Sequence, residues 1–151
     1  MERIAERIQV AQELQARAGL IRIFEELGYV DGASLTNEQI KAEKKPMFWE
    51  DILDTSIAQS KPYYIVFKIG TSTSEYADNK IMKSNLAITI DVFTTKNIAS
   101  EGTYALREAL EIKFKESAEF NELILNTKFY DSRVNLNQIS YSTSKDFTFD
   151  A

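Results

Sequence analysis

The chain has 151 residues and contains neither cysteine nor histidine. A chain of this length buries roughly two-thirds of its unfolded surface and folds without disulfides or metal. Lacking cysteine, it has no disulfides, thiolate metal sites or cysteine nucleophiles, and lacking histidine it has no access to the commonest general acid–base residue and metal ligand. With 23 acidic and 18 basic residues, the net charge of −5 disfavours binding along the phosphates of duplex DNA. We therefore expect no metal, no cofactor and no sequence-specific nucleic-acid binding.

The hydropathy of the chain disfavours a membrane location. No apolar run approaches the ~20 residues that a membrane-spanning helix requires. Glu2, Glu6 and Glu13 interrupt the N-terminal segment, where a secretory signal would be continuously apolar. We expect a soluble, intracellular protein of its producing cell, with a single domain over residues 1–151 that comprises a helical part (1–60) and a sheet part (61–151).

The N-terminal segment has the periodicity of a helix. Apolar residues recur at spacings of three and four and so lie on one helical face: Ile4, Ile8, Ala11, Leu14, Ala18 and Ile21. Gly28 is a plausible C-terminal cap. This face has two interpretations: it packs onto its own domain, or it docks onto a neighbouring subunit.

Two further helices are predicted before the sheet part. Thr36 and Gln39 have the spacing of a capping box, which predicts a short helix over residues 37–44 that Pro46 ends. The apolar side chains that follow predict another helix up to about residue 58; they are Phe48, Trp49, Ile52, Leu53 and Ile57.

The sheet part begins after Pro62. Residues 63–69 are β-branched and aromatic, which predicts a mostly buried strand, and the polar residues 71–79 are either a loop or the tip of a long hairpin. The segment 86–95 alternates between apolar and more polar positions and is the clearest strand in the chain.

A helix and two strands complete the predicted fold. Asn97 or Ser100 could cap a helix over residues 99–117, with the charge pairs Arg107–Glu111 and Glu111–Lys115 on its exposed side. Residues 127–134 and 139–149 read as the last two strands. We therefore predict an α+β protein with a mainly antiparallel sheet of about four strands, helices packed on one face, and a helical N-terminal extension.

Catalytic motifs are scarce. The five glycines are too dispersed for a phosphate-binding loop. Glu111-Ile112-Lys113 with Asp91 upstream has the composition of a metal-dependent nuclease site, but the triplet falls inside a predicted helix, where the two charged side chains would not converge. Glu75 and Asp78 are more typical of solvated loop carboxylates than of metal ligands. We expect a protein that is not an enzyme.

The order of segments from about Pro62 to Phe149 resembles a family of bacteriophage tail-completion proteins. The matching segments are Pro62-Tyr63-Tyr64-Ile65-Val66-Phe67, a polar stretch containing Tyr76-Ala77-Asp78, the run from Leu86 to Lys96 with Asp91-Val92-Phe93-Thr94, and the helix and strands that follow. Family members typically begin with one helix before the first strand, so the longer helical N-terminus is a departure.

The resemblance implies a structural virion protein of the phage neck, a tail terminator. Such a subunit forms a ring, commonly a hexamer, that caps the tail tube protein and joins it to the head–tail connector. Its closed ring would use head-to-tail contacts. We expect the interaction residues to be Tyr76, Asp78 and Asn79 in the polar loop, and Ile4, Ile8 and Leu14 on the N-terminal helix. The alternatives are a small cytoplasmic adaptor or regulatory protein-binding domain, and an enzyme using Asp91 and Glu111.

Overall fold

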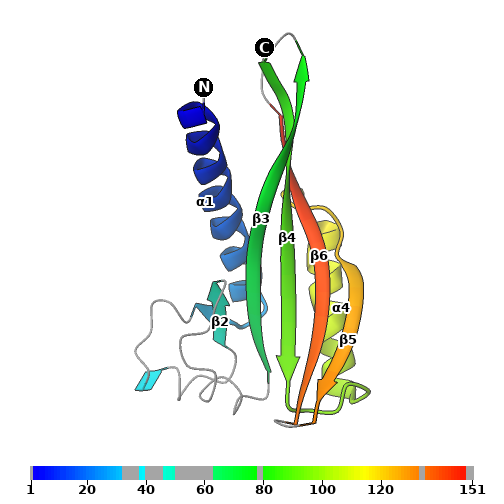
Figure 1. The fold of residues 1–151 in the computed structure, drawn as a ribbon. Coiled ribbons are helices and arrows are strands. Elements are labelled where there is room, and N and C mark those ends of the chain that lie inside the picture. The colour runs from blue at the N-terminus through cyan, green and yellow to red at the C-terminus, as the bar shows by residue number, and fades with distance from the viewer. Residues whose placement is uncertain are drawn as a thin grey trace.

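The computed structural model describes residues 2–31, 38–39, 46–49, 63–77, 80–132 and 135–148. In chain order these form α1 (Glu2–Glu26), β1 (Val30–Asp31), β2 (Pro46–Trp49), β3 (Tyr63–Ala77), β4 (Lys80–Thr94), α4 (Glu101–Glu116), β5 (Ile124–Asp131) and β6 (Leu136–Thr148). Figure 1 shows one twisted sheet with α1 beside its β3 flank and α4 behind β5 and β6. The predicted α+β class is confirmed.

The sheet has the strand order β1-β2-β3-β4-β6-β5. The four long strands β3, β4, β6 and β5 pair antiparallel, as predicted, while β1 and β2 extend the β3 edge in parallel. The predicted helix over residues 48–58 is wrong where it can be compared, because Phe48 and Trp49 pair with Val66 and Phe67 as part of β2. A short apolar stretch bordered by proline does not distinguish a strand from a helix by periodicity alone. Residues 50–58 lie outside the described residues.

The main hydrophobic core lies between the sheet and both helices, while Tyr64 and Val66 are buried on the opposite face. Ile65 and Phe67 of β3 alternate with side chains that point to the other face, and Ile90 pairs with Phe67 in register. From the helices, Phe24 of α1 packs against Phe67 at a ring-centroid distance of 5.7 Å and against Phe114 of α4 at 6.3 Å. Both helices therefore bury their apolar sides against the same face, and we call the opposite side the open face of the sheet.

The buried side of α1 is not the side that apolar periodicity predicts. Gln12, Ala16, Leu20 and Phe24 are the residues that face the sheet, whereas Leu14 is 60% exposed. The buried side of α1 is thus the side that faces the sheet, and this is not the most apolar stripe of the helix. The helix ends at Glu26, and Gly28 follows it as the predicted C-terminal cap. The φ of Gly28 is +90°, a left-handed conformation that glycine adopts without steric penalty.

The strands β3 and β4 form a hairpin of 15 residues on each side, much longer than the predicted strands. The polar residues 71–77 therefore belong to the hairpin and not to a loop. A register shift between Ile69 and Ser72 separates the helix-covered part of the hairpin from its outer part. We call residues 72–77, 80–85 and 146–148 the distal arm, a three-stranded extension whose end lies beyond both helices in Figure 1.

Helix α4 begins after Ser100, which is one of the two N-terminal caps that the sequence predicts. The Ser100 side chain accepts a hydrogen bond from the Thr103 backbone N–H at 3.3 Å, which satisfies a free donor of the first turn. Arg107 and Glu111, which were predicted to form a charge pair with each other, both hydrogen-bond to the same hydroxyl group on the sheet. The Tyr141 hydroxyl of β6 accepts from Arg107 Nε at 3.2 Å and donates to Glu111 Oε1 at 3.1 Å. These bonds anchor α4 to the centre of the sheet.

Candidate interaction surfaces

The distal arm is polar and its end is exposed. Tyr76 is 65% exposed near the turn of the hairpin, so this predicted interaction residue is available to a partner. The other two predicted residues of the turn, Asp78 and Asn79, lie outside the described residues. Large exposed aromatic side chains are enriched at protein–protein interfaces, because they combine an apolar ring with a polar tip.

Side-chain hydrogen bonds hold the strands of the arm together. Ser74 and Ser84 pair their hydroxyls at 3.1 Å across the hairpin. Asp146 of β6 accepts from Asn85 at 2.7 Å and from Asn121 at 3.1 Å, and these hydrogen bonds, that from Asn85 foremost, lower the pKa of its carboxyl group. The arm is therefore stabilised by polar pairs rather than by a hydrophobic core.

The contact between α1 and the arm is also polar. Gln9 Oε1 accepts a hydrogen bond from the Ser72 backbone N–H at 3.1 Å. Gln12 is 4% exposed, yet neither its amide nitrogen nor its amide oxygen has a hydrogen-bond partner within the structure described. A buried polar group without a partner costs about 1–3 kcal/mol. Burial of this amide therefore opposes the packing of α1, whereas the hydrogen bond from Ser72 to Gln9 supports it.

Close approach elsewhere fixes the other half of α1. A Cβ at Gly19 would come within 3.0 Å of the Phe120 ring and would also collide with the Glu119 carboxylate, so any larger residue would force these side chains to shift. Two ion pairs flank the contact, Arg22 to Glu119 at 2.5 Å and Lys113 to Glu26 at 2.7 Å. The Lys113 ammonium lowers the pKa of the exposed Glu26 carboxyl, through their hydrogen bond first and their charges second.

The outward side of α1 carries part of the apolar face that the sequence predicts. Val10 and Leu14 are both more than half exposed, and Ala11 and Ala18 beside them are exposed too. The backbone of Ile4 and Ile8 lies in the same helix, but their side chains are not among those that the structure describes. Of the two interpretations of this face, packing onto its own domain is wrong for Leu14.

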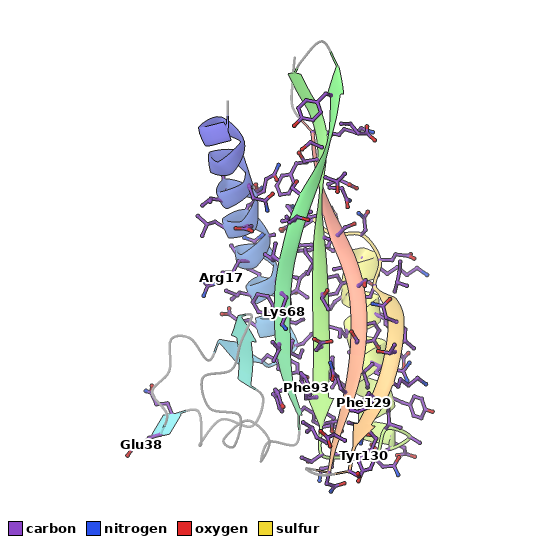
Figure 2. The ribbon with its side chains drawn as sticks, in the orientation of Figure 1. Arg17, Glu38, Lys68, Phe93, Phe129 and Tyr130 are labelled. Atoms are coloured by element: carbon purple, nitrogen blue, oxygen red, sulfur yellow. The ribbon has the colours of Figure 1, made fainter. Side chains whose placement is uncertain are left out.

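A third surface was missed by sequence reasoning. Strand β5 is the outermost strand, and all of its residues except Asp131 are exposed. Figure 2 shows Phe129 and Tyr130 on this strand at the rim of the sheet, and both are more than half exposed. The signal was the adjacency of Ile124 to Leu125 and of Phe129 to Tyr130, which places apolar side chains on both faces of one strand.

The carboxylates of the suspected nuclease site do not come together. Asp91 alternates with the core residues Ile90 and Val92 and therefore lies on the open face. Glu111 lies on α4 and bonds to Tyr141 on the helix-covered face. The sheet separates them, and in the described ranges no three acidic residues are grouped in a way that could hold a metal ion. Within the same residues no helix is long and apolar enough to cross a membrane.

Comparison with known proteins finds a likeness at the level of structure only. No protein-family model matches the chain, and no curated protein matches its sequence. A chain of the solved structure titled "Virion of native gene transfer agent (GTA) particle" is similar with a TM-score of 0.43 and 11% identity, over 84% of this chain and 92% of that chain. A likeness of this extent by itself assigns neither a family nor a function to the protein.

Proposed function

We propose that the protein is a structural component of a phage-type virion, a tail terminator of the neck whose subunits assemble into a ring. The observation that carries the proposal is the distal arm. The segments that resemble tail-completion proteins fold as one long hairpin followed by α4 and two antiparallel strands, and the hairpin extends past the helices with Tyr76 exposed near its end.

The physical character of the arm suits docking rather than catalysis. Its strands are joined by backbone ladders and by polar side-chain pairs, so it keeps its shape without a core of its own. An arm of this kind offers a polar surface with the exposed Tyr76 near its end to a neighbouring subunit or to the tail tube protein. We assign Tyr76, Asp78 and Asn79 to this contact.

The exposed stripe of α1 supplies the second surface of the proposal. A ring closed by head-to-tail contacts needs two different surfaces on each subunit. Leu14 and Val10 present apolar side chains on the outward side of a helix, where a neighbour would remove them from water, and Ile4 and Ile8 would extend this stripe. The proposed partners are of two kinds. Further copies of the chain would form a hexameric ring, and the tail tube protein and the head–tail connector would bind to the two faces of that ring.

The test is the particle mass and shape of the purified protein, by light scattering and negative-stain electron microscopy. Rings, or rings that form as concentration rises, are the expected result. Tyr76→Ala and Leu14→Ala should weaken ring formation, whereas Tyr104→Ala, an equally exposed residue on α4, should not. A monomer at all concentrations that also fails to bind purified tail tubes would favour the small adaptor domain instead.

A further inference from the structure

We infer that the outer edge of β5 pairs with the same strand of a second copy of this chain, antiparallel and about a two-fold axis that passes beside Phe129. The inference does not rest on the proposed function, because this two-fold contact uses neither the distal arm nor the stripe on α1. It concerns the rim of the sheet that lies farthest from both.

The first observation is that β5 is a long edge without protection. It is the last strand of the sheet, seven of its eight residues pair with β6, and no described strand lies against the other side. Free backbone N–H and C=O groups along such an edge are a template for another strand, and proteins usually blunt them with proline, charges or a covering element. β5 contains no proline, and its charged residues are Lys128 and, at its end, Asp131.

The second observation is the apolar character of the edge on both faces of the sheet. Phe129 pairs with Gln138 of β6, which in turn pairs with Phe93 of β4, so all three lie on the open face. Tyr130 points to the helix-covered face. Phe129 is 59% exposed, and a soluble protein gains by covering such side chains with a partner of matching character.

The other edges of the sheet explain why the partner is β5 itself. β1, at the opposite rim, is only two residues long and offers too short a ladder. The free edge of β3 in the distal arm is contacted by α1, where Gln9 already binds the Ser72 backbone N–H. A second β5 offers an edge of equal length and equal exposure, and an isologous pair closes after two chains because each subunit has one such edge.

Charge and alternation select the register. In β5, Phe129 and Asp131 share the open face with Thr127, while Lys128 and Tyr130 share the other face. Centring the pair on Phe129 places Lys128 opposite Tyr130 of the partner subunit and Thr127 opposite Asp131 of the partner subunit, which keeps every opposed pair on one face. Centring it on Lys128 would place two ammonium groups directly opposite each other, which is unfavourable.

The bulge in β5 limits the length of the ladder. The register with β6 shifts between Leu125 and Thr127, and the Asn126 amide turns to donate a hydrogen bond to the Ser142 hydroxyl. Pairing between the two copies therefore covers the part of the strand after the bulge. An interface this short buries less than the roughly 1,200–2,000 Å² of a stable complex. We expect a weak dimer, which calls for a test that captures brief encounters.

The test uses the absence of cysteine from the chain. A single Phe129→Cys variant places a thiol beside its own copy across the two-fold axis. Directly opposed residues of antiparallel strands have Cα atoms about 4.5–5.5 Å apart, which lies within the range of about 4.4–6.8 Å that a disulfide spans. Phe129 is largely exposed, so its replacement should leave the fold intact.

Under mild oxidation, Phe129→Cys should form covalent dimer on the order of tenfold faster than the exposed control Tyr104→Cys, because opposed thiols meet at an effective concentration of about millimolar. Lys128→Cys should behave like the control, since its own copy is not opposite. Mixing Thr127→Cys with Asp131→Cys should give the mixed dimer. Equal rates for Phe129→Cys and Tyr104→Cys would overturn the inference, as would a Lys128→Cys dimer that outpaces Phe129→Cys. Rings that persist while Phe129→Cys fails to cross-link would sink this contact and leave the proposed function standing.

Discussion

The strands β3, β4 and β6 differ in the character of their side chains between the helix-covered half and the distal arm. In the helix-covered half, β3, β4 and β6 bury Phe67, Ile90 and Tyr141 against α1 and α4. In the distal arm the corresponding positions are Ser74 and Ser84, which pair their hydroxyls. Backbone ladders continue through both halves, so the shape is common to them. Hydrophobic burial is concentrated in the first half, and in the arm Phe147 of β6 is only partly buried against the core. We infer that the covered half supplies most of the stability of the fold, and that the arm presents its polar side chains to solvent or to a partner.

The largest expected effect tests that division directly. Phe67→Ala should lower the free energy of unfolding by about 3–5 kcal/mol, because it removes a buried ring that packs against Phe24 and leaves a cavity. Tyr76→Ala in the arm should change it by less than about 0.5 kcal/mol. Urea unfolding followed by circular dichroism measures both. Comparable losses for the two variants would show that the arm shares in the global stability.

A second substitution should sharpen the contrast by improving the contact between α1 and the hairpin. Gln12→Leu should raise the free energy of unfolding by about 1–2 kcal/mol, since it replaces a buried amide whose nitrogen and oxygen have no described partner with an apolar side chain of similar size. Gln15→Leu, on an exposed position of the same helix, is the matched control and should give no gain. Thermal unfolding decides: no rise in Tm for Gln12→Leu would mean that the amide is satisfied in solution.

The hydroxyl that links α4 to the sheet should contribute less. Tyr141→Phe removes the hydrogen bonds to Arg107 and Glu111 and should lower the free energy of unfolding by about 1 kcal/mol. The pKa of the Tyr141 hydroxyl is raised above its ordinary value, and burial of the side chain is the largest cause of that shift. The folded state therefore holds this proton more tightly than the unfolded state, and the associated stability is present below about pH 10 and lost above it. Unfolding measured at pH 8 and pH 11 should show that decline in the native protein and a smaller one in Tyr141→Phe.

The smallest effect concerns the arm alone. The pKa of Asp146 is lowered by its hydrogen bonds from Asn85 and Asn121, so the stabilisation is present at neutral pH and is lost as pH falls through the lowered value, below about 4. Because the carboxyl group is largely exposed, we expect no measurable shift in global stability. Asp146→Ala at pH 7 should speed amide hydrogen exchange in residues 80–85 and leave residues 88–93 unchanged. Faster exchange in both segments would contradict the separation of the two halves.

Much of the fold was accessible from local sequence patterns. The alternation over residues 86–95 predicted β4, and the candidate caps Asn97 and Ser100 predicted where α4 begins, because both signals involve residues a few positions apart. The glycine cap at Gly28 was equally local. The fold class followed from the order of these elements.

The interaction surfaces were harder to predict. The polarity of residues 71–77 permitted a loop or a hairpin, and only pairing with β4, itself paired with β6, decided for strands. Of the predicted site residues, Tyr76 and Leu14 are exposed. The docking roles of these two residues stay predictions, as do those of Ile4, Ile8, Asp78 and Asn79. The exposed edge at Phe129 was missed because exposure depends on strand order, which no local pattern contains.

The amino-acid order alone therefore settled the elements with a clear period or cap, the α+β class, and the lack of histidine and cysteine chemistry. Tertiary structure decided which stripe of α1 is buried, that Phe48 and Trp49 lie in a strand, and which strand ends the sheet. The reason is physical: helix periodicity and capping arise between neighbours in the chain, whereas burial and strand pairing arise between segments that only folding brings together.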